Sequence, residues 1–235
     1  GFPKGVINII TGEPEEIGRE ITSNPKVRKI SFTGSTAVGR ILMQQSANTV
    51  KKLSLELGGN APFIVFDDCD VEAAVEGLML GKFRNTGQVC VSPNRIYVQE
   101  KIYDNFIKKV VEVIKKLKMG DGLKDETQLG PLIDDAAITK VEEHIKDAVA
   151  KGATVELGGK RHVLGGRFYE ATVLANVNDS MKLANEETFG PVAPFFKFKT
   201  EEEVIELANN TEFGLAAYFF SKDIARIWRV AEAIE

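Results

Sequence analysis

The chain has 235 residues, and its 30 Lys and Arg against 34 Asp and Glu give a net charge of −4 at pH 7. This acidic balance argues against a general nucleic-acid-binding protein, which would carry a basic patch, and no apolar run approaches the roughly 18 residues of a membrane span. With 43% hydrophobic and 27% charged residues, the composition is that of a globular protein of one or two domains.

Apolar runs alternate with helical patterns along the chain, which predicts an α/β fold. A domain boundary is predicted at Gly58-Gly59, where one strand ends and a new series of strands and helices starts. Strands are expected at residues 6–10, 28–33, 53–57, 62–66, 94–99, 154–157, 171–175, 193–198 and 216–221. Helices are expected at residues 14–22, 36–47, 101–117, 134–151, 201–208 and 224–234, with a further helix that Asp70 caps and that ends near Phe83.

The chain has two cysteines, Cys69 and Cys90, and no CxxC pair, so it predicts neither a disulfide framework nor a zinc site, and no metal site is expected. Because residues 1–25 show no signal-peptide pattern, a reduced cytoplasmic setting is expected. The chain begins without methionine and enters a Pro/Gly turn at once, so we interpret its visible start as lying within a longer protein.

The segment Phe32–Gly39 is typical of a strand end, a glycine turn at Gly34 and a helix start at Ser35. A helix amino terminus offers N–H groups and the positive end of a dipole to anions, and glycine lets a phosphate approach the backbone. The alternative is a simple helix cap by Ser35 or Thr36. The segment matches neither the G-x-G-x-x-G pattern nor the P-loop pattern, so it does not by itself indicate phosphate binding.

Two further positions could carry proton transfer or nucleophilic chemistry. Glu56 follows Leu53 and Leu55 at the end of a strand that looks buried, where a raised pKa would suit a general base; the alternative is a surface salt bridge. Cys90 lies in a glycine turn between a helix and a strand, where a thiol can be exposed and activated; the alternative is a small buried apolar residue. Cys69 lies among aspartates that disfavour a thiolate, so we interpret it as structural.

The segment Glu186–Val192 pairs two carboxylates, Glu186 and Glu187, with Phe189 just before Gly-Pro. A carboxylate can accept hydrogen bonds from both hydroxyls of a ribose. The alternative is a solvated loop.

Together these four segments resemble the aldehyde dehydrogenase superfamily. Glu56 precedes Cys90 by 34 residues and Glu187 follows it by 97 residues, and both spacings fit the family. The resemblance covers essentially the whole chain. It implies an α/β protein with a partial Rossmann-like cofactor domain at residues 1–58, followed by a catalytic domain at residues 59–235 that is incomplete at its C-terminal end.

The resemblance implies oxidation of an aldehyde with NAD or NADP. Cys90 would be the nucleophile and Glu56 the base that activates water, which favours hydrolysis of the thioester over transfer to coenzyme A. The pyrophosphate would face Gly34 and Ser35, and the nicotinamide half would meet Leu57, Glu187 and Phe189. The expected cofactor-binding residues are therefore Gly34, Ser35, Gly39, Leu57, Glu187 and Phe189.

Within the superfamily the chain is most similar to the succinate-semialdehyde dehydrogenase branch, on residues 82–88, 187–191 and 227–232. There Arg84 would hold the distal carboxylate of the substrate; the alternative is a cation that pairs with a helix C-terminus. Succinate semialdehyde is the leading substrate, ahead of glutarate semialdehyde and small uncharged aldehydes. Some members carry a second cysteine two positions after the nucleophile. Here that position is Ser92, so a redox-switch disulfide is not expected.

Two other hypotheses compete with this one. A cysteine hydrolase would need a base beside Cys90, but His144 lies on a Lys/Glu-rich helix and His162 in a glycine loop, so both are expected at the surface. The other hypothesis is an inactive piece, because the family's cofactor domain begins upstream of Gly1 and its oligomerisation strands lie downstream. The 235 residues alone are expected to be inactive, and the complete protein is expected to be a homo-oligomer, a dimer or tetramer.

Overall fold

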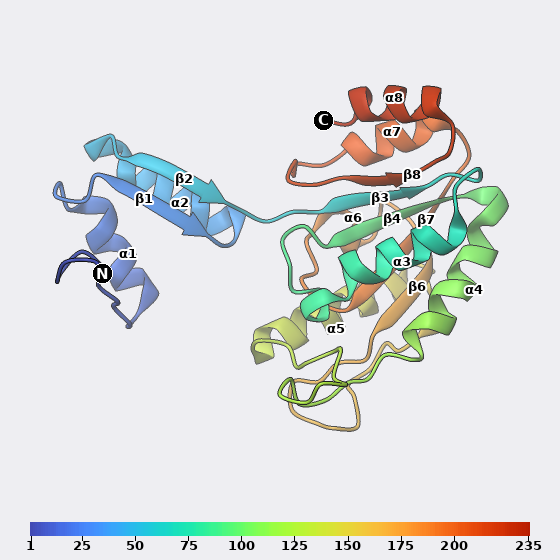
Figure 1. Ribbon diagram of the computed structural model, residues 1–235, viewed down its shortest axis with the longest axis horizontal. Coiled ribbons are helices and arrows are strands. Elements are labelled where there is room, and N and C mark those ends of the chain that lie inside the picture. Colours follow the sequence, from blue (N-terminus) through green and yellow to red (C-terminus); the bar gives the residue numbers. More distant parts are fainter. The chain divides into compact units, whose positions relative to one another are not determined.

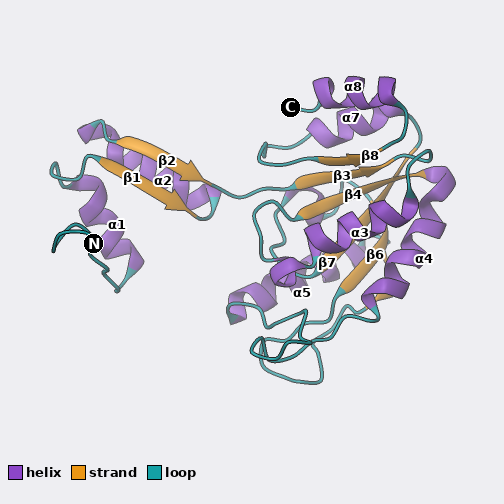
Figure 2. Ribbon diagram, viewed as in Figure 1, coloured by secondary structure: helices purple, strands orange, loops and turns teal.

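The computed structural model describes residues 1–235, which divide into two compact units, Gly1–Gly58 and Gly59–Glu235. The division falls at the Gly58-Gly59 pair where the sequence predicts a boundary. Both units combine parallel strands with helices, as the predicted α/β fold requires (Figures 1 and 2). None of the helices has the length and apolarity that crossing a membrane requires.

The first unit is built on two parallel strands, β1 (Lys29–Thr33) and β2 (Lys52–Glu56), in a register that pairs Thr33 with Glu56. Helices α1 (Pro14–Ser23) and α2 (Thr36–Ser46) contact each other, and α2 lies against one face of the strands (Figure 1). Alternate residues along each strand are exposed, so only one face of this small sheet is covered. A short 3₁₀ turn, η1 (Ala47–Thr49), follows α2.

The strand predicted at residues 6–10 is wrong, because residues 1–13 form turns and irregular backbone. Val6, Ile7, Ile9 and Ile10 are all more than half exposed. A β-rich run becomes a strand only when it finds a neighbour to pair with, and the first unit offers none to this segment.

The second unit is a six-stranded sheet in the order β5-β6-β7-β4-β3-β8. All neighbouring strands run parallel except the antiparallel pair β5 and β6. The central strands β3 and β4 are buried along nearly their whole length, as expected for a parallel sheet covered on both faces. The strands are β3 (Ala61–Val65), β4 (Pro93–Gln99), β5 (Thr154–Leu157), β6 (Thr172–Val177), β7 (Val192–Phe198) and β8 (Tyr218–Phe220).

Helices cover both faces of this sheet (Figure 2). Residues of α3 and α4 pack with Phe63 and Val65 in one cluster, whereas residues of α5, α7 and α8 pack with Ile64 in another. Adjacent residues of β3 thus serve opposite faces, as the pleat requires. The helices are α3 (Val71–Lys82), α4 (Tyr103–Ile114), α5 (Asp135–Ala150), α6 (Lys182–Asn185), α7 (Glu201–Asn209) and α8 (Ile224–Ala233), with 3₁₀ turns η2 (Arg84–Gly87) and η3 (Glu100–Ile102).

The remaining strand and helix predictions are confirmed, most of them within two residues at each end. Asp70 caps α3 as predicted, since its side chain accepts hydrogen bonds from the N–H groups of Glu72 and Ala73. The helix predicted at 101–117 is shorter, because it opens with η3 and ends at Ile114. The short segments η2 and α6 were not predicted.

Candidate active site

Three loops of the second unit meet at one edge of the sheet. Gly59 precedes β3, Cys90 precedes β4, and Glu187 precedes β7. These strands are neighbours in the order β7-β4-β3 and run parallel, so their amino ends lie at the same edge. The candidate site of this unit is therefore at the amino ends of parallel strands, opposite to the edge at which most open α/β sheets bind ligands.

The turn before Cys90 has an unusual backbone. Asn85, Thr86 and Gly87 all have positive φ angles, of 51°, 58° and 75°, a conformation that a β-branched residue such as threonine rarely adopts. The Thr86 hydroxyl accepts a hydrogen bond from the N–H of Gly130 at 2.9 Å and donates to the carbonyl of Gly130 at 3.2 Å. These two hydrogen bonds hold the strained turn in place.

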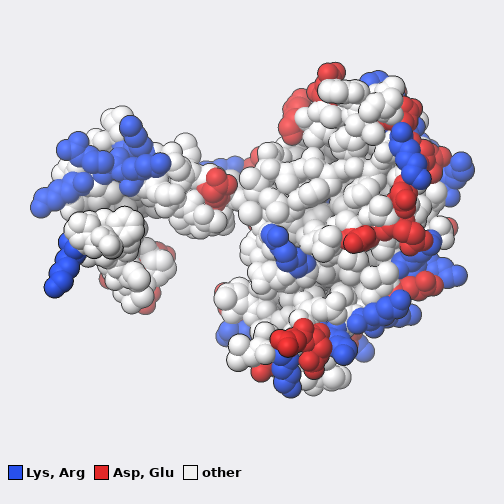
Figure 3. Space-filling model, in the orientation of Figure 1, with Lys and Arg blue, Asp and Glu red and all other residues white.

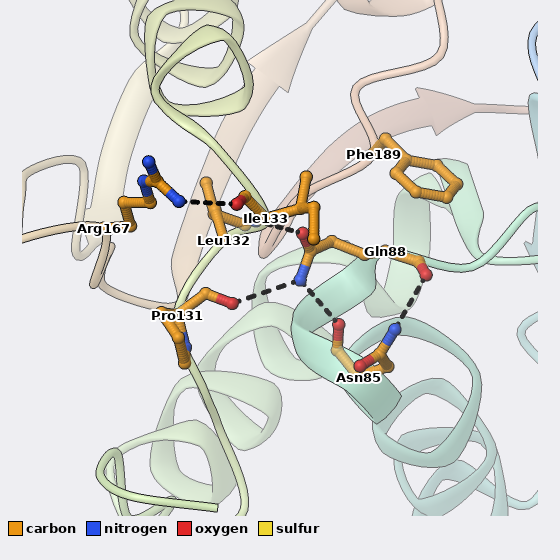
Figure 4. Close-up of a pocket in the computed structure, with 7 residues that line it drawn as sticks. All are labelled: Asn85, Gln88, Pro131, Leu132, Ile133, Arg167 and Phe189. Atoms are coloured by element: carbon orange, nitrogen blue, oxygen red, sulfur yellow. Dashed lines mark hydrogen bonds between the residues drawn. The ribbon is translucent and has the colours of Figure 1, made fainter. Parts of the chain in front are cut away.

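The same turn borders a pocket of about 500 Å³ that reaches from Asn85 and Gln88 to Phe189. The side chain of Gln88 donates to the carbonyl of Asn85 and accepts from the N–H of Ile133, while Arg167 donates to the carbonyl of Ile133 (Figure 4). Phe189 lies at the border of this pocket, opposite Arg167 (Figure 4). The polar side chains that line the pocket are thus occupied in holding loops together.

Gly59 is the point at which the Cys90 and Glu187 loops meet. A Cβ at Gly59 would overlap the carbonyl oxygen of Cys90, so only glycine allows this approach. The N–H of Gly59 donates to Oε1 of Glu187 at 3.2 Å. The structure thereby brings two sequence-predicted residues to one spot, through a glycine to which the sequence analysis gave no role.

The two residues have different surroundings. Cys90 is a free, half-buried thiol, unlike the buried Cys69, whose pKa burial and nearby carboxylates raise to about 11. Burial raises the pKa of Glu187, against the hydrogen bond from Gly59 and the positive charges of Lys140 and Lys82. Glu187 is half-buried, so the alternative of a fully solvated loop is wrong for this residue.

Lys82 is fully buried at the end of α3, directly before the Cys90 loop. Its ammonium donates to Oδ1 of Asn94 in β4 at 2.8 Å. Burial lowers its pKa to about 7, opposed by the negative charge of Glu187. The two ends of the loop are therefore tied by a buried polar pair. Ser92, where some relatives have a second cysteine, is also fully buried.

Arg84 is exposed on the Cys90 loop. Tyr218, the first residue of β8, donates its hydroxyl to the carbonyl of Val91 at 2.9 Å. Burial raises the pKa of Tyr218, and the charges of Arg84 and Cys90 act on it in opposite directions. Arg84 and Cys90 are thus both near enough to the Tyr218 hydroxyl for their charges to act on it.

His144 corrects the sequence analysis, because it is 1% exposed rather than at the surface. It belongs to the buried stripe of α5, three residues after Val141, and this spacing was the signal in the sequence. Nδ1 lies 3.1 Å from the Thr188 hydroxyl and Nε2 lies 3.2 Å from the Glu186 carboxylate. Both ring nitrogens are engaged, so His144 is not available as the base of a cysteine hydrolase. His162 is half-buried in its loop.

In the first unit the predicted residues gather at the carboxyl ends of β1 and β2. Ser35 caps α2, with its hydroxyl accepting from the N–H of Val38 at 3.3 Å. The N–H of Gly34 donates to the carbonyl of Glu56 at 3.0 Å, which joins the glycine turn to the end of β2. A Cβ at Gly39 would come within 2.6 Å of the Leu57 side chain, so Gly39 is a packing position beneath Leu57.

Glu56 itself is exposed, and β2 is only half-buried on its better covered face. The expectation of a buried strand around Glu56 is therefore wrong for β2. Within the first unit, nothing covers the outer face of the two-stranded sheet. Lys29 and Lys52 lie side by side on that face. Figure 3 shows lysine and arginine side chains gathered on the visible face of this unit.

The residues at the α2 terminus fit a nucleotide cofactor. The first N–H groups of a helix have no acceptor within the helix, Gly34 lacks a side chain, and the loop is exposed. These features suit a pyrophosphate. In the second unit the half-buried carboxylate of Glu187 is able to accept hydrogen bonds from hydroxyl groups. No group of three or more His, Cys, Asp and Glu residues in the chain has the arrangement of a metal site.

A comparison with sequence families matches residues 1–235 to the aldehyde dehydrogenase family. Several relatives are 57% identical over the whole chain, and three of them are named here. They are the NADP(+) succinate-semialdehyde dehydrogenase of Escherichia coli, the glutarate-semialdehyde dehydrogenase of Pseudomonas aeruginosa and the 3-sulfolactaldehyde dehydrogenase of Pseudomonas putida. The chain spans about half of each relative, 49%, 49% and 48% of their lengths.

Solved structures agree with this similarity. The succinate-semialdehyde dehydrogenase of Burkholderia pseudomallei is 62% identical with a TM-score of 0.99, over 100% of this chain and 49% of that one. The betaine aldehyde dehydrogenase of Staphylococcus aureus, solved in complex with NAD+, is 42% identical with a TM-score of 0.95, over 100% of this chain and 47% of that one.

Proposed function

Because this chain belongs to the aldehyde dehydrogenase family, we propose that the complete protein oxidises an aldehyde with a distal anionic group to the carboxylic acid, using NAD or NADP. Succinate semialdehyde is the first candidate substrate and glutarate semialdehyde the second. The observation that carries this proposal is an exposed arginine, Arg84, six residues before a half-buried free thiol, Cys90.

The relatives support the anionic substrate class. The aldehydes in the names of the three relatives given above carry a carboxylate or a sulfonate at the end away from the aldehyde. A guanidinium can bind either group through two parallel hydrogen bonds. Arg84 is the cation of the Cys90 loop, so it can fix the far end of the substrate while the aldehyde faces the thiol.

In the proposed reaction the Cys90 thiolate attacks the aldehyde carbon and forms a C–S bond, which leaves a negative charge on the oxygen. Backbone N–H groups of the Cys90 loop would stabilise that charge. The nicotinamide cofactor, when bound, supplies the hydride acceptor for the oxidation. Gly34 and Ser35 would hold its pyrophosphate, Leu57 and Phe189 its nicotinamide ring, and Glu187 its ribose, while Gly39 supports Leu57 from below.

The second half of the reaction releases the acid. Loss of the hydride leaves a thioester on Cys90. Glu56 then takes a proton from water, the resulting hydroxide attacks the thioester carbon, and the C–S bond breaks to return the Cys90 thiolate. Glu56 belongs to the first unit and Cys90 to the second. The proposal thus assigns the general base to the first unit and the nucleophile to the second.

A substrate panel tests the proposal. The complete protein is assayed for nicotinamide reduction with succinate semialdehyde, glutarate semialdehyde and an uncharged aldehyde of similar length, each with NAD+ and NADP+. We expect kcat/KM to favour an anionic aldehyde by about tenfold or more. Higher kcat/KM for the uncharged aldehyde would contradict the anionic substrate class, and no reduction with any aldehyde would contradict the activity.

We further propose that the complete protein works as a homo-oligomer, a dimer or tetramer, in the cytoplasm. The family resemblance supports the oligomer, and the absence of a disulfide framework supports a reducing setting. Native mass spectrometry of the purified protein measures the first, and fractionation of the source cells measures the second.

A further inference from the structure

The buried histidine of α5 has no part in the chemistry proposed above. His144 is 1% exposed. Its two hydrogen-bond partners, Glu186 and Thr188, lie on either side of Glu187 in the loop before β7. The imidazole thus bonds to the residues on both sides of Glu187, which is proposed above to hold the ribose of the cofactor.

The hydrogen bonds determine the form of the imidazole. An ionised Glu186 carboxylate only accepts hydrogen bonds, so Nε2 carries the proton and donates to it over 3.2 Å. Nδ1 of the neutral ring is then an acceptor, and the Thr188 hydroxyl donates to it over 3.1 Å. Thr188 is 2% exposed, so this bond satisfies a hydroxyl that water does not reach.

The alternation of side chains explains how this contact aims Glu187. Backbone at Glu186 is extended, with φ −120° and ψ 136°, and successive side chains of an extended segment point to opposite sides. Glu186 and Thr188 both contact His144, whereas Glu187 between them has a different partner. Its carboxylate accordingly accepts from the N–H of Gly59, beside Cys90.

The loop needs such a hold because its backbone is strained. Phe189 has φ 53°, a conformation that is unfavourable for a bulky residue and persists only where the surroundings impose it. The next residue, Gly190, packs so closely on Val141 of α5 that a Cβ would come within 2.6 Å of it. His144 and Val141, one turn apart on α5, thus contact the loop at Thr188 and Gly190, the residues on either side of Phe189.

We propose that His144 is a positioning residue for the nicotinamide cofactor. It accepts a hydrogen bond from the Thr188 hydroxyl and donates one to the Glu186 carboxylate, and these two bonds fix the loop that presents Glu187 and Phe189. This inference rests on the proposed function, since it takes the cofactor to be NAD or NADP. The ligand interaction concerned is the one between the Glu187 carboxylate and the ribose hydroxyls.

The charged groups around the ring favour its neutral form. Burial lowers the pKa of His144, and Lys140 on α5 and Lys182 on α6 act in the same direction, whereas Glu186 raises it. Protonation in acid would turn Nδ1 from an acceptor into a donor, and the Thr188 hydroxyl would lose its acceptor. Cofactor affinity should therefore fall as the pH drops below the ordinary histidine value of 6.5.

Isothermal titration calorimetry of NAD+ and NADP+ with the complete protein tests the role of the hydrogen bond between Thr188 and His144. Thr188→Val keeps the shape and removes the hydroxyl, whereas Thr188→Ser keeps the hydroxyl. We expect the Val variant to raise the Kd of the preferred cofactor about tenfold and the Ser variant to leave it near that of the parent. In steady-state assays the Val variant should raise the KM for the cofactor with kcat little changed.

A second pair of variants tests the imidazole itself. The side-chain amide of His144→Asn can place its carbonyl oxygen near the position of Nδ1 but does not titrate, so this variant should lose affinity in acid less steeply than the parent. The remaining fall belongs to Glu187, whose pKa burial raises. His162→Asn changes the other histidine of the chain, which lies in a loop away from α5 in the sequence. This control variant should keep the acid dependence of the parent. This pair decides the question if Thr188→Val does not fold.

The outcomes separate the two proposals. Unchanged affinity in Thr188→Val, or the same acid dependence in His144→Asn and the parent, would overturn the positioning role while the proposed function stands. Absence of cofactor binding in the parent would overturn both. Weaker binding in Thr188→Val but not in Thr188→Ser, together with a smaller loss of affinity in acid for His144→Asn than for the parent, would support the role.

Discussion

Replacing Lys82 with methionine should stabilise the protein at neutral pH, although it removes a hydrogen bond. The ammonium is fully buried and its pKa is lowered from 10.5 to about 7. Each tenfold change in proton affinity corresponds to about 1.4 kcal/mol, so the folded state disfavours the charged form by about 5 kcal/mol. Methionine has a similar length and flexibility and carries no charge to bury.

The pH dependence follows from this direction. Since the folded pKa lies below the unfolded value, the unfolded chain binds more protons between pH 7 and 10.5. The full destabilisation is present below pH 7, and the free energy of unfolding of the parent rises as the pH increases through this range. Asn94 loses its donor in the variant, which costs about 1–3 kcal/mol at every pH.

Lys82→Met should therefore be more stable than the parent by about 2 kcal/mol near pH 7 and less stable by about 1 kcal/mol near pH 10. Urea denaturation followed by circular dichroism, at several pH values, measures this difference. Lys146→Met, at an exposed lysine of α5, is the control and should show no such crossing. A Lys82→Met variant that is several kcal/mol less stable at pH 7 would refute the reasoning, because the ammonium would then be stabilised by its buried partners.

Further changes test the candidate site in the complete protein. Cys90→Ala should abolish dehydrogenase turnover, and normal turnover would remove the nucleophile role. Glu56→Gln should give a burst of reduced cofactor with slow steady turnover, measured by stopped-flow absorbance; an unchanged steady rate would assign the base elsewhere. Arg84→Gln should raise the KM for an anionic aldehyde about tenfold or more and leave that for an uncharged aldehyde unchanged, with Arg84→Lys intermediate. Gly59→Ala should lower turnover and slow alkylation of the Cys90 thiol, because its methyl group would overlap the Cys90 carbonyl; parent-like alkylation would contradict the close approach.

Short-range features of the sequence were sufficient for most of the secondary structure. The Asp70 cap, the helical stripe of α5 and the apolar run of β3 each depend on residues a few positions apart, and the structure follows them. The strand expected at residues 6–10 failed for the complementary reason. Pairing requires a neighbour, and no local pattern states whether a neighbour exists.

The sequence also supplied Cys90, Glu56 and Glu187 as candidates, through residue types and spacings that resemble a known family. It did not show that Cys90 and Glu187 meet at Gly59, because that contact depends on the order of β3, β4 and β7 in the sheet. Strand order is a long-range property that distant pairings decide.

Burial of polar groups was the other property that only the tertiary structure decided. Lysine is rarely buried, and His144 has charged neighbours in the sequence, so both residues are expected at the surface, yet both are within the core. Each is buried because a partner from a distant element, Asn94 or the Glu186–Thr188 loop, satisfies its hydrogen bonds. The sequence by itself therefore determined which groups could carry the chemistry, and the packing of distant elements decided which groups hold them in place.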